Sequence, residues 1–165
     1  KRNINNGIGE MIKYGMIYSK ELFNDLLNKD IFSNLEKYIY DSLLIKKYFV
    51  EEDEYDKGLR QLLNFGHTYG HAYEAHYNYN KYLHGEAVGL GMLLVTKNQT
   101  IKNDLLKILK KYNLPTKDKV EIKELLKYIK NDKKNNSTHL NLIVVDEIGS
   151  AKIVKVKENE YEYNW

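Results

Sequence analysis

The sequence GLRQLLNFGHTYGHAYEAH, residues 58–76, has a spacing of apolar residues that indicates a helical fold. Its apolar residues and glycines recur every three or four positions, and this spacing predicts a helix from Leu59 to about Tyr77. One side of that helix is expected to be apolar, with Leu59, Leu62, Leu63, Gly66, Tyr69, Gly70 and Tyr73. Another face is expected to be polar, with Arg60, Asn64, His67, His71 and Glu74. A row of such polar side chains can bind an anion, a metal ion or a polyhydroxylated substrate.

The plain alternative is that this polar row is only a solvated helix face. Two observations argue against it. Of the 26 cationic residues only Arg2 and Arg60 are Arg, and a guanidinium suits phosphate or carboxylate in a way that an ammonium does not. Gly66 and Gly70 lower helix stability beside the histidines but permit close approach of a neighbour. The polar row is therefore a candidate site.

Four of the five histidines lie between residues 67 and 84. His67 and His71 have the i, i+4 spacing that can place two imidazoles on one metal ion. A zinc site needs a third ligand, and His84 and Glu86 at the start of the next predicted helix are candidates for it. No HExxH motif is present, so a zincin protease is not indicated.

The rest of the chain is also predicted to be mainly helical. A short first helix carries Ile8, Met11, Ile12 and Met16, and a long helix carries an apolar stripe of Ile31, Leu35, Ile39, Leu43 and Val50. Further helices are expected at about residues 84–99, 102–112 and 121–130, with a loop at 131–136. After that loop the β-branched runs 140–145 and 152–156 predict a small hairpin.

Composition limits the class of protein. The 165 residues hold 26 Lys and Arg against 23 Asp and Glu, and a net charge of +3 gives no argument for a nucleic-acid partner. The absence of Cys excludes disulfides, thiolate catalysis and Cys-ligated metal. No long apolar run and no basic-then-apolar leader is present, so we expect no membrane partner and a cytoplasmic location.

Three further motifs extend the pattern of the opening stretch. They are NNGIGEMIKYGMI at residues 5–17, YLHGEAVGLGM at 82–92 and DKK at 132–134. Their order and spacing resemble the C-terminal half of the 3-dehydroquinate synthase family, within the sugar-phosphate cyclase superfamily. The resemblance covers nearly the whole chain and implies a multi-helical domain, residues 1–165, that binds metal and substrate.

The resemblance also implies a reaction. In that family bound NAD oxidises a hydroxyl of 3-deoxy-arabino-heptulosonate 7-phosphate beside a divalent metal, Zn²⁺ or Co²⁺. Phosphate is eliminated, the ketone is reduced again, and the opened ring closes to 3-dehydroquinate. This is a step of the shikimate pathway toward chorismate and the aromatic amino acids, and the enzyme is a lyase.

Site residues follow from the resemblance position by position. Glu10, His67 and His84 match the family's metal ligands. The substrate-binding positions are Lys13, Lys46, Arg60, Asn64, His71 and one of Lys133 and Lys134, with Lys13, Arg60 and His71 in catalytic roles. By this analogy His71 binds substrate rather than metal, and neither Glu74 nor Glu86 is a ligand. Asp56 departs from the family pattern, which usually has Glu four residues before the Arg of GLR, and Lys57 stands where a small or neutral residue is common.

NAD itself has no recognisable site in these residues. Neither a GxGxxG loop nor an alternation of strands and helices is present, and the family keeps its NAD-binding α/β domain in the N-terminal half. We therefore expect the chain to act with that separate domain, as a homodimer when full-length, and to be inactive without it. Two alternatives remain: another sugar-phosphate cyclase, forming an inosose or a valiolone, and a metal-free helical module that binds phosphate or nucleic acid.

Overall fold

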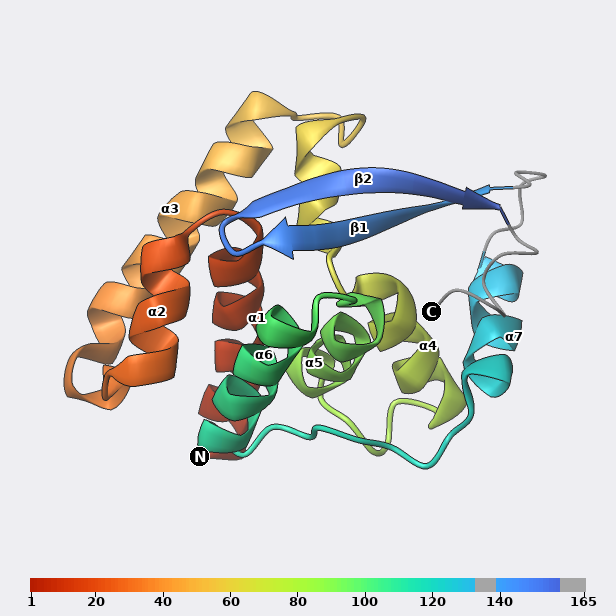
Figure 1. Ribbon diagram of the computed structural model, residues 1–165, viewed down its shortest axis with the longest axis horizontal. Coiled ribbons are helices and arrows are strands. Elements are labelled where there is room, and N and C mark those ends of the chain that lie inside the picture. The colour runs from red at the N-terminus through yellow and green to blue at the C-terminus, as the bar shows by residue number, and fades with distance from the viewer. Residues whose placement is uncertain (133–138, 158–165) are drawn as a thin grey trace.

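Helices make up most of the chain in the computed structural model, which describes residues 1–132 and 139–157 (Figure 1). The α-helices are α1 (Arg2–Ile17), α2 (Lys20–Asn28), α3 (Leu35–Glu52), α4 (His67–His76), α5 (His84–Val95), α6 (Gln99–Lys111) and α7 (Ile122–Asp132). Two 3₁₀-helices, η1 (Ile31–Asn34) and η2 (Leu59–Asn64), and two strands, β1 (His139–Glu147) and β2 (Ser150–Lys157), complete the described elements. The prediction of a mainly helical chain with a hairpin near the C-terminus is confirmed. No helix of the described residues is both long and apolar enough to cross a membrane.

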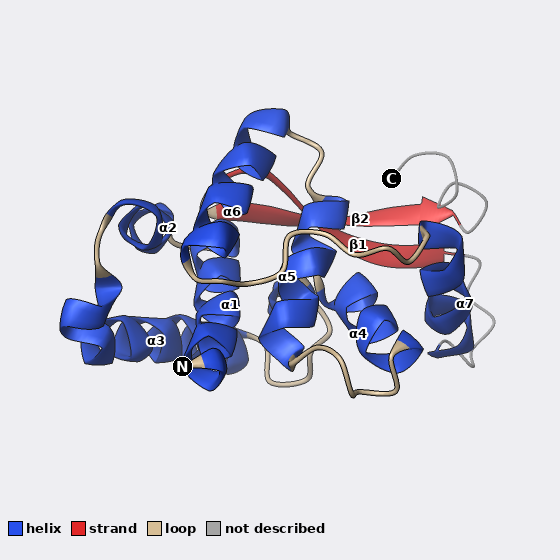
Figure 2. Cartoon of the chain, turned by 90° about the horizontal axis from the view of Figure 1, so that it is seen from below, coloured by secondary structure: helices blue, strands red, loops and turns tan. Residues whose placement is uncertain are grey.

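Helix α5 forms the centre of the fold. It packs against α1 on one side and α4 on the other, as Figure 2 shows. Its small and aliphatic residues are buried nearly all round, with Ala87, Val88 and Met92 fully inaccessible. Burial of this apolar surface stabilises the helix from every side, which explains why a helix without a polar face is stable here.

The antiparallel hairpin of β1 and β2 lies across the helices (Figure 1). β1 buries a run of apolar residues, including Leu142 and Ile143, against α1 and α5, whereas β2 is largely exposed. The backbone N–H of Gly149, in the turn, donates to the carbonyl oxygen of Met16 at 2.9 Å. This bond fixes the hairpin turn to the end of α1, and the far end of the hairpin reaches toward α7.

One continuous helix from Leu59 to Tyr77 is not what forms, so that prediction is wrong. The chain makes η2, breaks at Phe65 and Gly66, and begins α4 at His67. Gly66 has φ +76°, a left-handed conformation that favours glycine and ends the first helix. The expected polar row is therefore divided between two elements with different axes.

The apolar stripe predicted for the long helix is right at its start, where Ile31 is buried and Leu35 packs against the core, and wrong in its middle. Ile39 and Leu43 are exposed, and α3 instead buries Tyr38, Ser42, Ile45 and Phe49. The serine is tolerated there because its hydroxyl donates to the carbonyl oxygen of Tyr38 at 2.7 Å. The prediction counted only apolar residues as buried, and it therefore overlooked Ser42, whose hydroxyl is satisfied by a hydrogen bond.

One further helix and one helix boundary differ from expectation. The pattern did not predict α2, whose N-terminus is capped by the Ser19 hydroxyl accepting from Leu22 N–H. The helix expected at 84–99 ends at Val95, and Asn98 caps the separate helix α6.

Candidate metal and substrate site

Three side chains from three helices converge beside α5. The Nε2 atoms of His67 and His84 lie 3.3 Å apart, and Glu10 Oε1 lies 3.8 Å from each. A tetrahedral Zn²⁺ with ligands at about 2.0–2.1 Å has ligand atoms about 3.3 Å apart. The triangle formed by these three atoms is therefore close to the size that one metal ion requires.

Hydrogen bonds on the far side of each imidazole define which nitrogen faces this centre. His67 Nδ1 lies 3.1 Å from the carbonyl oxygen of Phe65, and His84 Nδ1 lies 3.2 Å from Glu74 Oε1. A carbonyl oxygen and a carboxylate only accept, so each Nδ1 carries the proton and each Nε2 presents a lone pair. Such a partner on the second nitrogen is the usual arrangement of metal-bound histidines.

The third member of the cluster is a carboxylate oxygen of Glu10. Its Oε1 is buried and makes no hydrogen bond to the described residues, 1–132 and 139–157. Three lone pairs thus meet in one place, an arrangement that is repulsive by itself and becomes favourable around a cation. The donor set of two imidazoles and one carboxylate fits Zn²⁺ or Co²⁺.

Glycines bring the helices that carry these three side chains close together. Gly9 precedes Glu10 and Gly85 follows His84, and α1 and α5 approach each other at this pair. A Cβ at Gly9 would lie 2.5 Å from the carbonyl oxygen of Gly85. Across the other side of α5, a Cβ at Gly91 would lie 2.0 Å from the carbonyl oxygen of Gly66, where α4 begins. Side chains at these positions would hold the helices, and with them the ligands, further apart.

Lys13 lies three residues after Glu10 on α1 and forms an ion pair with it. Its Nζ is 2.7 Å from Glu10 Oε2, and its side chain is only 3% exposed. Burial lowers the pKa of Lys13, and the nearby positive charge of Lys46 lowers it further against the opposing effect of Glu10. Burial alone would raise the pKa of Glu10, but the charge of Lys13 and its hydrogen bond hold the pKa below its ordinary value. Burial, followed by the charge of Lys13, lowers the pKa of His67 to about 4, so this imidazole is neutral and able to bind a metal at neutral pH.

A cavity of about 310 Å³ lies next to the three converging side chains. It is lined by Asp56, Gln61, Asn64, His67, Thr68, His71, Ile129, Leu140, Asn141 and Ile143. Of the predicted substrate-binding residues, Asn64 and His71 therefore line the same cavity as His67. Asp56, the departure from the family pattern, lines it too and has a positive φ of 54°.

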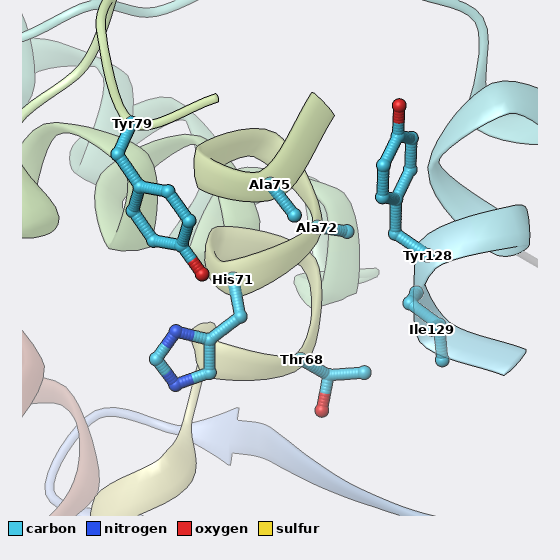
Figure 3. A pocket seen from close by; sticks show the side chains of 7 residues that line it. All are labelled: Thr68, His71, Ala72, Ala75, Tyr79, Tyr128 and Ile129. Carbon is cyan, nitrogen blue, oxygen red and sulfur yellow. The ribbon is translucent and has the colours of Figure 1, made fainter. Parts of the chain in front are cut away.

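A second cavity of about 510 Å³ adjoins the first and shares His71 with it. Figure 3 shows His71 and Tyr79 on one side of α4, and Tyr128 and Ile129 of α7 on the other. The His71 side chain is 53% exposed, which leaves it accessible from both cavities.

The remaining predicted residues lie around or outside this space. Lys46 is exposed on α3, and its charge acts on Lys13. Arg60 is half-buried and absent from the cavity lining, and its Nη1 donates to the carbonyl oxygen of Glu54 at 3.1 Å. Lys133 and Lys134 lie outside the described residues.

The sequence placed Glu74 in the polar row but gave no role to this residue, which joins the two parts of the site. Glu74 is buried, with Oε2 2.9 Å from His71 Nδ1 and Oε1 3.2 Å from His84 Nδ1. Its place three residues after His71 on one helix was the available signal, because i, i+3 side chains are neighbours. The i, i+4 spacing of His67 and His71 suggested a shared metal, but His67 groups with Glu10 and His84, whereas His71 groups with Glu74 and His84.

Two carboxylates that the sequence did not single out position the surrounding loops. Asp53 accepts the backbone N–H groups of Lys57, Gly58 and Arg60, which fixes the loop before η2. Asp118 is buried and accepts from Tyr77, Lys81 and Tyr82, in the loop that leads to His84.

Comparison with known proteins identifies relatives of this chain. A sequence model of the family described as 3-dehydroquinate synthase C-terminal matches residues 7–135. The 3-dehydroquinate synthase of Dictyoglomus turgidum is 42% identical over 170 residues, which cover 94% of this chain and 48% of the relative. That of Clostridium perfringens is 44% identical over 176 residues, covering 98% and 50%. The chain thus spans about half the length of the curated relatives it matches.

Solved structures share the fold at low sequence identity. A 2-epi-5-epi-valiolone synthase from Streptomyces hygroscopicus, with NAD⁺ and Zn²⁺ bound, superposes with a TM-score of 0.81 at 20% identity and covers 98% of this chain and 49% of its own. A 2-deoxy-scyllo-inosose synthase complexed with carbaglucose-6-phosphate, NAD⁺ and Co²⁺ gives a TM-score of 0.73 at 21% identity, covering 98% and 50%.

Proposed function

The chain belongs to the 3-dehydroquinate synthase C-terminal family, and we propose that it is the metal- and substrate-binding part of an enzyme that converts 3-deoxy-arabino-heptulosonate 7-phosphate to 3-dehydroquinate. In this proposal Glu10, His67 and His84 bind one Zn²⁺ or Co²⁺. The observation that carries it is the convergence of the two Nε2 atoms and the buried, unpartnered Glu10 Oε1 beside a cavity. NAD is held mainly by the N-terminal half that the relatives possess.

When bound, the metal acts as a Lewis acid on the reacting hydroxyl oxygen and NAD accepts and later returns a hydride. The chain's own residues then bind and orient the substrate. The positive charges that bind the carboxylate and phosphate of the substrate come from Lys13, Lys46 and Arg60. Binding at both ends restricts the orientations of the substrate before it reacts. Asn64 donates from its amide to a hydroxyl or phosphate oxygen. His71 holds or transfers a proton at a phosphate oxygen from the edge of the cavity.

Zinc titration tests the metal site without relying on activity. We expect the metal-free protein to bind one equivalent of Zn²⁺, and Glu10→Ala, His67→Ala and His84→Ala each to weaken binding strongly because each removes one of three ligands. Glu124→Gln, an exposed carboxylate on α7, is the matched control and is expected to leave the affinity unchanged. Binding of no metal by the folded protein would favour the metal-free phosphate-binding module instead.

Turnover tests the rest of the proposal. The 165 residues are expected to give no reaction with NAD, metal and heptulosonate phosphate, and to become active when the N-terminal half is supplied. Robust turnover by the 165 residues alone would contradict the division of labour between the halves.

A substrate panel separates this proposal from that of another sugar-phosphate cyclase. The curated relatives at 42–44% identity favour the heptulosonate substrate, whereas the valiolone and inosose synthases at 20–21% identity show only the shared fold. Preference of the complete protein for another sugar phosphate over the heptulosonate would overturn the assignment.

A further inference from the structure

A single buried carboxylate lies between two imidazoles from different helices. Glu74 of α4 accepts from His71, one turn back on its own helix, and from His84 at the start of α5. We propose that Glu74 is a positioning residue that orients both imidazoles at once, one toward the metal and one toward the substrate. The inference rests on the proposed function, because it assigns a role to Glu74 within that same site.

The chemistry of the carboxylate determines what both histidines present. An ionised carboxylate has acceptors only, so both imidazoles must place their proton on Nδ1 to bond with it. The Nε2 of His84 is then a lone pair, directed at His67 Nε2 3.3 Å away. The Nε2 of His71 is likewise left as an acceptor, the form that takes a proton from a substrate or solvent group.

The packing around Glu74 makes this arrangement stiff. Its side chain is only 9% exposed, while those of His71 and His84 are 53% and 41% exposed. The two imidazole rings contact each other, with centroids 5.6 Å apart, but the carboxylate is the buried group that both share. Gly70, beside His71 in α4, packs directly on Val88 of α5, which holds the two helices at the distance that one carboxylate can bridge.

Replacing the carboxylate by an amide tests whether both imidazoles must donate to residue 74. Glu74→Gln keeps the shape, but a carboxamide has one acceptor oxygen and one donor nitrogen. It can accept from only one imidazole and must donate to the other, which forces that ring to carry its proton on Nε2. If this ring is His84, a metal ligand is lost, and if it is His71, the acceptor at the substrate cavity becomes a donor.

Imidazole ¹⁵N chemical shifts give the first readout, on the unaltered protein. In the metal-free protein, at a pH where both rings are neutral, we expect His71 and His84 to be Nδ1–H tautomers. Detection of the Nε2–H tautomer for either ring would overturn the inference. This measurement needs no substitution, so it decides the question even if a variant fails to fold.

Zinc titration of variants gives the second readout. Glu74→Gln is expected to weaken Zn²⁺ binding about 10- to 100-fold, the usual effect of losing a hydrogen-bond partner of a metal-bound histidine. Glu124→Gln is the control. Unchanged Zn²⁺ affinity and unchanged tautomers in folded Glu74→Gln would overturn the role of Glu74.

A second group, His71, Glu74 and His84, is also close enough together to bind a metal ion. The same zinc titration distinguishes this possibility from a positioning role. A second equivalent of Zn²⁺ that is lost in Glu74→Gln, while the first remains, would make Glu74 a ligand rather than a positioning residue. Failure of the unaltered protein to bind any Zn²⁺ would instead overturn the proposed function, while the tautomers would still decide whether Glu74 orients the rings.

Discussion

The side-chain Oδ1 of Asn6 accepts the backbone N–H of Gly85 at 2.6 Å, so that a residue of α1 caps the first turn of α5. The same oxygen also accepts from Glu86 N–H. Helix N-termini leave such donors without partners in their own helix, and a side chain from another element satisfies them here. The cap ties α1 to α5 next to Glu10 and His84, and the relative position of these two side chains therefore depends on this crossing.

Gly85→Ala is expected to disrupt that crossing. The added Cβ would lie 2.0 Å from the carbonyl oxygen of Asn6, so α1 and α5 must separate. We expect a loss of about 1–3 kcal/mol in the free energy of unfolding and weaker Zn²⁺ binding, measured by urea unfolding and zinc titration. Gly7→Ala is the matched control. Nothing lies within 4 Å of a Cβ at Gly7, and this change in α1, the other helix of the crossing, is expected to stabilise the protein by about 0.5–1 kcal/mol. Equal effects of the two substitutions would contradict the role of the crossing.

Lys13→Met should change stability and metal binding in opposite directions. The variant leaves Glu10 without the ammonium 2.7 Å from its Oε2, so the metal-free protein is expected to be less stable. A bound Zn²⁺ replaces the missing positive charge, so zinc should raise the melting temperature more in the variant than in the unaltered protein. Lys127→Met, which removes an exposed i, i+3 partner of Glu124, is the control and should show neither effect. A smaller zinc-induced rise in Lys13→Met than in the unaltered protein would count against this account.

Asp118 predicts an acid-dependent part of the stability. Burial alone would raise the pKa of Asp118, but hydrogen bonds from Lys81 and Tyr82 hold it well below its ordinary value. A carboxyl whose pKa is lowered by folding stabilises the protein above its unfolded pKa of about 4, and this contribution is lost as the pH falls below that value. Asp118→Asn is expected to cost about 1–3 kcal/mol at pH 7, since its amide turns a donor toward Lys81 and the tyrosines. Unfolding of this variant and of Asp104→Asn, a control whose side chain is 31% exposed, should be compared from pH 7 to pH 3. An unaltered acid slope in Asp118→Asn would sink the prediction.

His71→Ala should separate catalysis from metal binding. The imidazole of His71 is hydrogen-bonded to Glu74 and is not one of the three side chains that converge at Glu10. We expect turnover by the complete protein to fall about 10²-fold or more, with Zn²⁺ affinity within a few-fold of the unaltered value. His76→Ala, at the end of the same helix and outside both cavity linings, serves as the comparison and should retain turnover. Loss of zinc together with activity in His71→Ala would contradict the separation.

The sequence indicated the helical class and the hairpin because both depend on local periodicity. The resemblance of its motifs to a known family implied the site residues, and the structure brings Glu10, His67 and His84 together from positions far apart in the chain. Whether these residues bind metal remains a prediction.

Local pattern failed where long-range contacts decide the structure. A periodic apolar reading cannot show that Gly66 adopts a positive φ beneath Met92, and so it extended one helix through the break. It cannot show that Ser42 is buried and Leu43 exposed, because that choice depends on which side of α3 meets α1. The role of Glu74 was missed for the same reason, since its second partner, His84, lies on another helix.

The origin of the three converging side chains also sets the order in which the site can form. His67 and His84 stand 17 residues apart in the adjacent helices α4 and α5, whereas Glu10 stands in the first helix. Contacts between neighbours in sequence close short loops and form early, while docking of α1 closes a long one and forms late. A chain that has paired only α4 with α5 offers two imidazoles and holds zinc weakly. If zinc binds these three side chains as proposed, tight binding requires α1 to be packed against α4 and α5, so zinc affinity would report whether this core is complete.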